Sequence, residues 1–408
     1  MLRKRSGIGF KRHLKAGLFL CFVTALTAQL HAQVTVKKSA AAENPGVYVA
    51  SFNGPEDLRR WFVSSLQRCD WFTVAPGRES AEYVIDCASP GGTPPALDVQ
   101  VSSQTAQIAR FRVTAPNMPV EWVAYRAVDK VIESVFRKPG LCASRIAFAV
   151  GSGGRKEVFT CNFDGTSPRQ VTRQGTIATE PSWGPGATAM VYTLYENNAT
   201  TVVLADMTNQ RQRRMSVFPG LNSGAALSPD GRWAAVCLSP DSRVDLFLLE
   251  VASGRLHRLT NDAAAESSPC WSPDGTRICF VSGRAGRPQL FITPARGGTP
   301  TRIQTGASET VSPDWSRTSN TLCFSMRMGK QYALGVLDLN SRSPQTKIVT
   351  NAAGDWESPS WAPDGRHVVC SQTTGHRRGL FMVDTWYGRI NAITQPQDHS
   401  LPSWSDLF

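Results

Sequence analysis

The sequence predicts a mostly β fold, a six-bladed β-propeller preceded by a small α/β domain. Two observations predict the propeller: a motif that recurs about every 44 residues, and strand-like runs between its copies. The clearest copies are Ser268-Pro-Cys-Trp-Ser-Pro-Asp-Gly275 and Ser358-Pro-Ser-Trp-Ala-Pro-Asp-Gly365. A repeat of about 40–45 residues is typical of a four-stranded propeller blade.

Each copy of the motif contains one bulky apolar residue that serves as an anchor for comparing the repeats. The anchors are Trp183, Leu227, Trp271, Trp315, Trp361 and Trp404. After each anchor comes a turn, often Pro-Asp-Gly, in which proline fixes φ and glycine permits a positive φ. Three further runs rich in Val, Ile, Leu, Phe and Thr follow each of the first five anchors, as expected for strands. Examples are the second runs 233–238 and 277–282 and the fourth run 301–305. Each repeat therefore predicts one blade of four strands.

The two ends of the repeat region are predicted to combine into one blade. The strand around Trp404 has no partner strands after it, whereas three strand-like runs at 145–150, 157–161 and 169–172 precede the first full repeat. The last strand of the chain is expected to complete this first blade and close the ring. Closure removes the unpaired edges of an open array. We assign the propeller to residues 141–408.

Residues 45–140 are predicted to form the small α/β domain. Strands are expected at 46–52, 83–87, 97–102 and 108–114. A first helix is expected because Leu58, Trp61, Phe62 and Leu66 fall at helical spacing on one face. A second helix is expected at 120–136.

The amino-terminal region is predicted to direct export. Residues 1–32 have a basic start and the apolar run 17–26, as in a signal peptide, with cleavage expected before Gln33. A membrane anchor is the alternative, but a span needs about 20 apolar residues. Residues 33–44 are polar and expected to be flexible. No later segment resembles a membrane span.

The charge of the chain does not favour nucleic acid as a partner. Six of the 12 net positive charges lie in residues 1–32, and the remaining basic residues are scattered. A nucleic-acid-binding surface usually has a localised basic patch.

The cysteines and histidines do not predict a chemical site. Cys69 and Cys87 lie in the small domain and are able to pair in an oxidising compartment. Cys237, Cys279, Cys323 and Cys370 fall in equivalent strands of successive repeats and are interpreted as buried apolar residues. No Cys-x-x-Cys, Gly-x-Ser-x-Gly or His-Glu-x-x-His motif is present. We expect no enzyme, catalytic residue, cofactor or metal site, although the sequence leaves open whether calcium occupies the channel.

One face of the predicted ring is the candidate binding site. Strand direction alternates in a blade, so the blade-to-blade connections and the second-to-third loops share a face around the channel mouth. The connections carry Glu180, Asn222, Glu266, Ser267, Glu309 and Glu357, and the loops carry Arg284, Arg287, Arg327, Lys330, Arg377 and Arg378. This pattern predicts a mouth of mixed charge, although solvation of surface loops explains any single residue equally well.

Three local stretches resemble the TolB family of periplasmic proteins in the Tol–Pal envelope system. They are Leu66-Gln-Arg-Cys-Asp-Trp-Phe72, the segment Tyr125–Ile132 followed by Ser144–Phe148, and Ser282-Gly-Arg-Ala-Gly-Arg-Pro-Gln-Leu-Phe291. The resemblance covers nearly the whole chain after residue 32. It implies the fold predicted above.

The resemblance also implies a function and a set of binding residues. It implies a monomeric scaffold that binds a Pal-like peptidoglycan-associated lipoprotein at the channel mouth and supports outer-membrane integrity and constriction during division. The expected binding residues are Leu221, Asn222, Gly224, Glu266, Ser267, Arg284, Glu309 and Glu357. Leu221 departs from the family, which usually has a polar residue there. A TolA-like inner-membrane protein is an expected partner of residues 33–44, by position only. The alternatives are a propeller that binds another envelope protein or a glycan, and a hydrolase.

Overall fold

The computed structural model describes residues 44–408, except 197, 217, 219 and 351–353. The predicted signal peptide and residues 33–43 lie outside the described residues, so their assignments stay predictions. Among the described residues, no helix has both the length and the apolar character needed to cross a bilayer.

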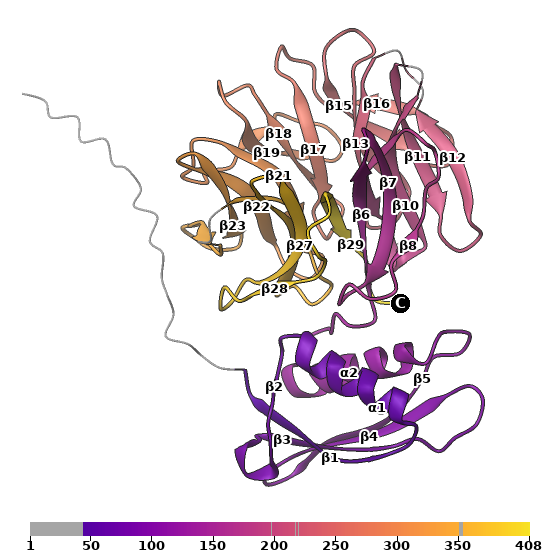
Figure 1. Ribbon diagram of the computed structural model, residues 1–408. Coiled ribbons are helices and arrows are strands. Elements are labelled where there is room, and N and C mark those ends of the chain that lie inside the picture. Colours follow the sequence, from indigo (N-terminus) through magenta and orange to yellow (C-terminus); the bar gives the residue numbers. More distant parts are fainter. Residues whose placement is uncertain (1–43, 197, 217, 219, 351–353) are drawn as a thin grey trace, which may run out of the picture. The chain divides into compact units, whose positions relative to one another are not determined.

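The small domain is a five-stranded sheet with both of its α-helices on one side (Figure 1). The strands lie in the order β2-β1-β3-β4-β5. Their bounds are β1 (Gly46–Asn53), β2 (Thr73–Val74), β3 (Tyr83–Ala88), β4 (Ala96–Ser103) and β5 (Gln107–Thr114), and the helices are α1 (Glu56–Arg68), the short 3-10 helix η1 (Arg78–Ser80) and α2 (Glu121–Phe136). Of the four residues that the helical spacing placed on one face, the first helix buries Leu58, Phe62 and Leu66, whereas Trp61 is half-buried.

The link between the small domain and the propeller is held by a buried carboxylate. Both oxygens of Asp129, on α2, accept hydrogen bonds of 2.8 Å, from the backbone N–H groups of Cys142 and Ala143. A Cβ at Gly140 would lie 2.0 Å from Oδ1 of Asp129. Only glycine therefore fits between the helix and the linker. Burial raises the pKa of Asp129 to about 6, despite these hydrogen bonds.

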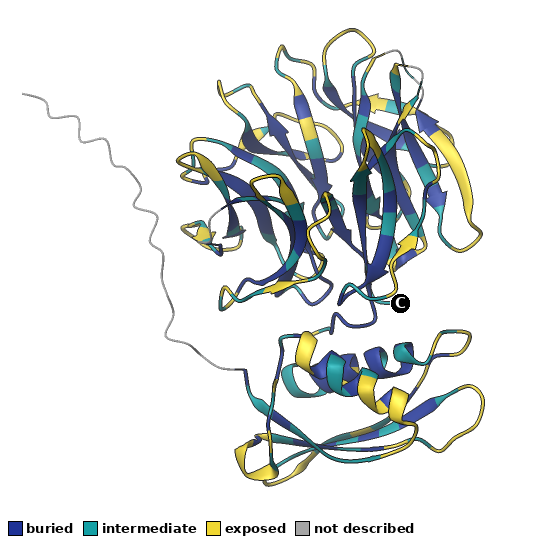
Figure 2. Cartoon of the chain, viewed as in Figure 1, coloured by how far each residue is buried: buried dark blue, intermediate teal, exposed yellow. Residues whose placement is uncertain are grey.

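The propeller consists of six blades of four antiparallel strands around a central channel, as the repeat predicted. A parallel contact of Lys156 with Ile177 joins the first two blades into one eight-stranded sheet. From the innermost strand outward, the first blade is β29 (His399–Trp404), β6 (Arg145–Ser152), β7 (Arg155–Asn162) and β8 (Arg169–Gln170), and the second is β9 (Ile177–Trp183), β10 (Ala189–Glu196), β11 (Ala199–Asp206) and β12 (Arg211–Ser216), with the 3-10 turn η2 (Pro185–Ala187). The third blade is β13 (Asn222–Leu227), β14 (Trp233–Leu238), β15 (Asp245–Glu250) and β16 (Leu256–Arg258), and the fourth is β17 (Glu266–Trp271), β18 (Arg277–Ser282), β19 (Gln289–Pro294) and β20 (Thr301–Arg302). The fifth blade is β21 (Thr310–Trp315), β22 (Thr321–Met328), β23 (Gln331–Asp338) and β24 (Lys347–Ile348), and the sixth is β25 (Asp355–Trp361), β26 (His367–Thr374), β27 (Arg377–Asp384) and β28 (Ile390–Ala392). Figure 2 shows that burial concentrates in the middle strands, whereas outer strands such as β12 are largely exposed.

The last strand closes the ring, as predicted. β29 pairs antiparallel with β6, with His399 opposite Val150 and Trp404 opposite Ile146. The first blade therefore combines strands from both ends of the propeller sequence. Trp404 has no exposed surface.

Every innermost strand carries a bulge that the sequence did not predict. The pairing register shifts in all six strands, and the residue three positions before each anchor has a φ between +50° and +61°. These residues are Glu180, Gly224, Ser268, Ser312, Ser358 and Leu401. Five of the six are not glycine, although a left-handed conformation is unfavourable for residues with a Cβ.

The cysteines of the described residues are all buried free thiols. The possible pairing of Cys69 with Cys87 is therefore not formed. Cys69 instead lies beside Cys142, whose pKa is raised by burial and by the Cys69 thiol. The interpretation of Cys237, Cys279, Cys323 and Cys370 as buried residues is confirmed.

Candidate functional site: the propeller channel and its mouth

The channel is a cavity of about 390 Å³ lined by the innermost strands of all six blades. Five blades contribute the proline that follows the residue of positive φ, and the remaining blade contributes Ala225. The charged residues of the lining include Asp314, Arg317 and Asp406.

Side chains inside the channel connect neighbouring blades at the position before the anchor. Asp314 Oδ2 accepts a 2.7 Å hydrogen bond from the backbone N–H of Trp361. Ser360 Oγ accepts one of 3.0 Å from Trp404, and Ser403 Oγ one of 3.1 Å from Trp183. Burial raises the pKa of Asp314. These channel groups therefore bind the ring together.

The small domain contacts the face of the propeller opposite the predicted mouth. Arg68 donates a 2.8 Å hydrogen bond to the backbone oxygen of Asp164, and Tyr125 bonds Thr166 at 3.3 Å. Trp71 Nε1 donates one of 3.0 Å to Asp364. These propeller residues lie in third-to-fourth turns or in a Pro-Asp-Gly turn. The connections that carry the predicted binding residues leave the opposite ends of the strands.

Glu266 and Arg284 form a buried ion pair at the mouth. Glu266 is 2% exposed, and its Oε1 lies 2.6 Å from Arg284. The same guanidinium pairs with Asp262 at 2.7 Å and lies over the rings of Phe280 and Phe291. Burial raises the pKa of Glu266 to about 7, although Arg284 favours the ionised form. The pair therefore presents little free charge.

Asn222 organises the connection that precedes its blade. It has no exposed surface, and its side-chain amide donates hydrogen bonds of 2.8 Å to the backbone oxygens of Thr200 and Phe218. The neighbouring Leu221 is half-buried. Gly224 occupies one of the bulges, and its N–H donates a 3.0 Å bond to Glu180 Oε2.

The other predicted binding residues are more accessible. Ser267 is exposed, and Glu309 and Glu357 are half-buried. Glu309 accepts a hydrogen bond from the hydroxyl of Tyr332, whereas Glu357 lies 3.9 Å from Arg378.

The predicted residues do not form a regular ring of charge. Glu266 lies five positions before its anchor, Glu357 four and Glu309 six. Because side chains alternate along a strand, position five points away from the side shared by positions four and six. The structure brings Glu266 and Arg284 into contact and leaves Glu309 and Glu357 with separate partners.

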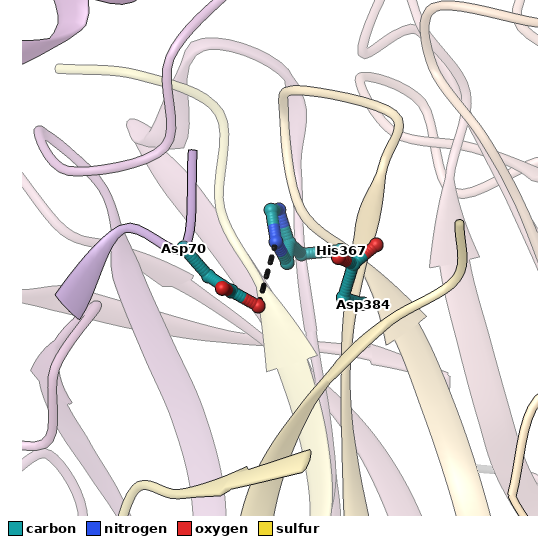
Figure 3. A group of neighbouring side chains, drawn as sticks. All are labelled: Asp70, His367 and Asp384. Carbon is teal, nitrogen blue, oxygen red and sulfur yellow. Dashed lines mark ion pairs between the residues drawn. The ribbon is translucent and has the colours of Figure 1, made fainter. Parts of the chain in front are cut away.

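A second charged group, which sequence reasoning missed, lies where the small domain meets the propeller. Ligand-type atoms of Asp70, His367 and Asp384 lie within 4.8 Å of one another (Figure 3). Two guanidiniums already pair with these carboxylates: Arg366 with Asp384 at 2.7 Å, and Arg389 with Asp70 at 3.0 Å and with Asp384 at 3.1 Å. We therefore interpret this group as an ionic network and not as a metal site.

The fold and the channel define a class: six-bladed β-propeller proteins with an amino-terminal α/β domain. The chain belongs to the TolB β-propeller family, because the family profile described as "TolB beta propeller domain" matches residues 132–408.

Individual relatives agree with this family. The chain is 31% identical over 137 residues to the Tol-Pal system protein TolB of Desulfosudis oleivorans, an alignment that covers 33% of this chain and 31% of that protein. It is 28% identical over 159 residues to the Tol-Pal system protein TolB of Gluconobacter oxydans, covering 38% of this chain and 35% of that protein. These alignments span about a third of the length of each curated relative. The crystal structure of TolB from Acinetobacter baumannii matches with a TM-score of 0.82 at 21% identity, over 90% of this chain and 98% of that one, which shows the shared fold.

Proposed function

We propose that the chain is the TolB-type component of a Tol–Pal system, a non-enzymatic scaffold in the periplasm. It binds a Pal-like peptidoglycan-associated lipoprotein at the channel mouth and supports outer-membrane integrity and constriction during division. The observation that carries the choice of site is the position of the small domain. Its hydrogen bonds from Arg68, Trp71 and Tyr125 fall on the turns of one propeller face, so the opposite face offers the channel mouth to a partner.

The chemistry of the mouth suits a protein partner. Interfaces combine a desolvated centre with a polar rim. Here Asn222 and Glu266 are buried, whereas Ser267, Glu309 and Glu357 have exposed surface. Charged groups at a rim steer association and discriminate between partners. A partner with basic side chains opposite Glu309 and Glu357 would match this arrangement.

The amino-terminal region completes the proposal. Residues 1–32 direct export, and residues 33–44 are the proposed contact for a TolA-like inner-membrane protein. The propeller itself is proposed to act as a monomer. Another envelope protein, or a glycan, is the second candidate partner for the same mouth.

Site-specific photo-crosslinking in cells tests this function. A photoreactive phenylalanine analogue replaces Ser267, which is exposed at the mouth, and a matched variant carries it at Glu79, which is exposed on the small domain. We expect the probe at position 267, and not the probe at position 79, to form an adduct that contains the Pal-like lipoprotein. The proposal fails if position 267 yields adducts only with other proteins, or if both positions yield the same adduct.

A further inference from the structure

The small domain and the propeller meet through a buried cluster of six ionisable side chains. The cluster consists of Asp70 from the small domain and Asp364, Arg366, His367, Asp384 and Arg389 from the propeller. Asp70 follows α1, and Asp364 and Arg366 belong to the turn between β25 and β26. His367 begins β26, Asp384 ends β27, and Arg389 lies in the turn that precedes β28. Arg366, His367, Asp364 and Asp384 are each at most 3% exposed.

The imidazole of His367 lies between carboxylates of the two domains. Its Nδ1 is 2.6 Å from Asp364 Oδ2, which also accepts the indole N–H of Trp71. Its Nε2 is buried without a hydrogen-bond partner and faces Asp70 Oδ2 at 3.8 Å (Figure 3). The ring therefore has an acceptor from the propeller on one nitrogen and a carboxylate from the small domain near the other.

Within the cluster, three carboxylates face two guanidiniums, so a neutral imidazole leaves one carboxylate without a cationic partner among the six side chains. Protonation of His367 supplies that partner. An uncompensated buried charge is strongly unfavourable. Asn44 and the rings of Trp71, Trp386 and Tyr387 complete the surroundings. Lys347 is a further cation near Asp384, and its Nζ donates hydrogen bonds to the backbone oxygens of Thr385 and Trp386.

We propose that His367 is a proton-operated latch, in which the imidazolium holds Asp70 of the small domain against Asp364 of the propeller and loss of the proton releases this edge of the junction. The device depends on neither the identity of the partner nor the choice of binding face. Contacts at the other edge, such as Tyr125 with Thr166, keep the domains associated. Release therefore loosens the junction and does not separate the two domains.

The direction of the pH effect follows from the two states of the histidine. Burial alone would lower the pKa of His367, but the charge and hydrogen bond of Asp364, with Asp70 and Asp384, raise it from 6.5 to about 9. The latch is therefore complete below pH 6.5 and is lost as the pH rises through 9. Between these values the constant for local opening should rise roughly tenfold per pH unit.

The first test is a nuclear magnetic resonance titration of the histidine Cε1–H signals in the full chain. The signal that is absent from the spectrum of His367→Gln is assigned to His367. We expect this signal in the unmodified protein to titrate near pH 9. Titration at or below pH 7 would overturn the proposal. A stable variant is needed only to assign the signal.

The second test is hydrogen exchange of residues 69–75, corrected for the intrinsic pH dependence of exchange. We expect the opening constant to rise roughly a hundredfold from pH 6.5 to 8.5 in the unmodified protein. In Asp70→Asn, residues 69–75 should already open at pH 6.5, and their opening constant should depend much less on pH. The matched control is Asp98→Asn, which removes an exposed ion pair with Arg112 within the same domain. A slope that is absent in the unmodified protein, or unchanged in Asp70→Asn, would show that the cluster is merely structural.

Discussion

Trp404 Nε1 donates a 2.7 Å hydrogen bond to Ser144 Oγ, which joins residues 260 positions apart in the sequence. Ser405 adds a second link, because its Oγ accepts a 2.9 Å bond from the backbone N–H of Arg145. The closing blade is therefore held by side chains as well as by the pairing of β29 with β6. Every blade can stay in place only while this junction is intact, because it seals the ring.

Truncation of Trp404 should destabilise the whole propeller. The side chain is fully buried, and replacing such a tryptophan with alanine costs about 3–5 kcal/mol. We expect Trp404→Ala to lower the free energy of unfolding in urea by this amount. Met328→Ala is the control, because Met328 is 41% exposed on β22. If both variants lose the same small amount, the last strand does not close the ring.

Gly224 is predicted to be required for its conformation and not for its small size. Its φ is +61°. For a residue with a Cβ, the left-handed conformation is unfavourable by about 1–2 kcal/mol. Gly224→Val should therefore destabilise the protein by at least this amount in thermal or urea unfolding. Gly283→Val is the control, since no atom lies within 4 Å of a Cβ there and its φ is not left-handed. Equal effects of the two substitutions would contradict the role of the bulge.

Glu266 should make the protein less stable as the pH rises. Its pKa in the folded state is about 7, above the ordinary 4.5, so the folded state holds this proton more tightly than the unfolded state. This contribution falls as the pH rises from about 4.5 to 7. We expect the free energy of unfolding in urea to fall less between pH 5 and pH 8 for Glu266→Gln than for the unmodified protein. Glu79→Gln, at an exposed site, is the control and should keep the original slope.

The repeat made the strands of the propeller predictable. β14 and β18 begin and end where the apolar runs 233–238 and 277–282 do, because each run is buried at five of its six residues and is flanked by turns. The short outermost strands agreed less well: the run 301–305 contains only the two-residue strand β20. Their pairing is limited to one neighbour, so local sequence defines their ends poorly.

The site was less predictable than the fold. The position of Glu266 in a blade-to-blade connection suggested an exposed charge, but Glu266 is buried in an ion pair with Arg284. The network of His367 was missed because Asp70 lies far away in the sequence, in another domain. Periodicity describes local structure, and it carries no information about which distant charges a domain contact brings together.

The affinity of the chain for the purified Pal-like lipoprotein tests the central claim most directly. Isothermal titration compares the unmodified protein, the mouth variant Glu309→Lys/Glu357→Lys, and a matched variant Glu79→Lys/Glu82→Lys with the same charge change on the exposed surface of the small domain. We expect the unmodified protein and the matched variant to bind with the same Kd, and the mouth variant to bind at least tenfold more weakly with an unchanged melting temperature. Equal affinity of all three proteins, or no binding by the unmodified protein, would contradict the proposal that this mouth receives the lipoprotein.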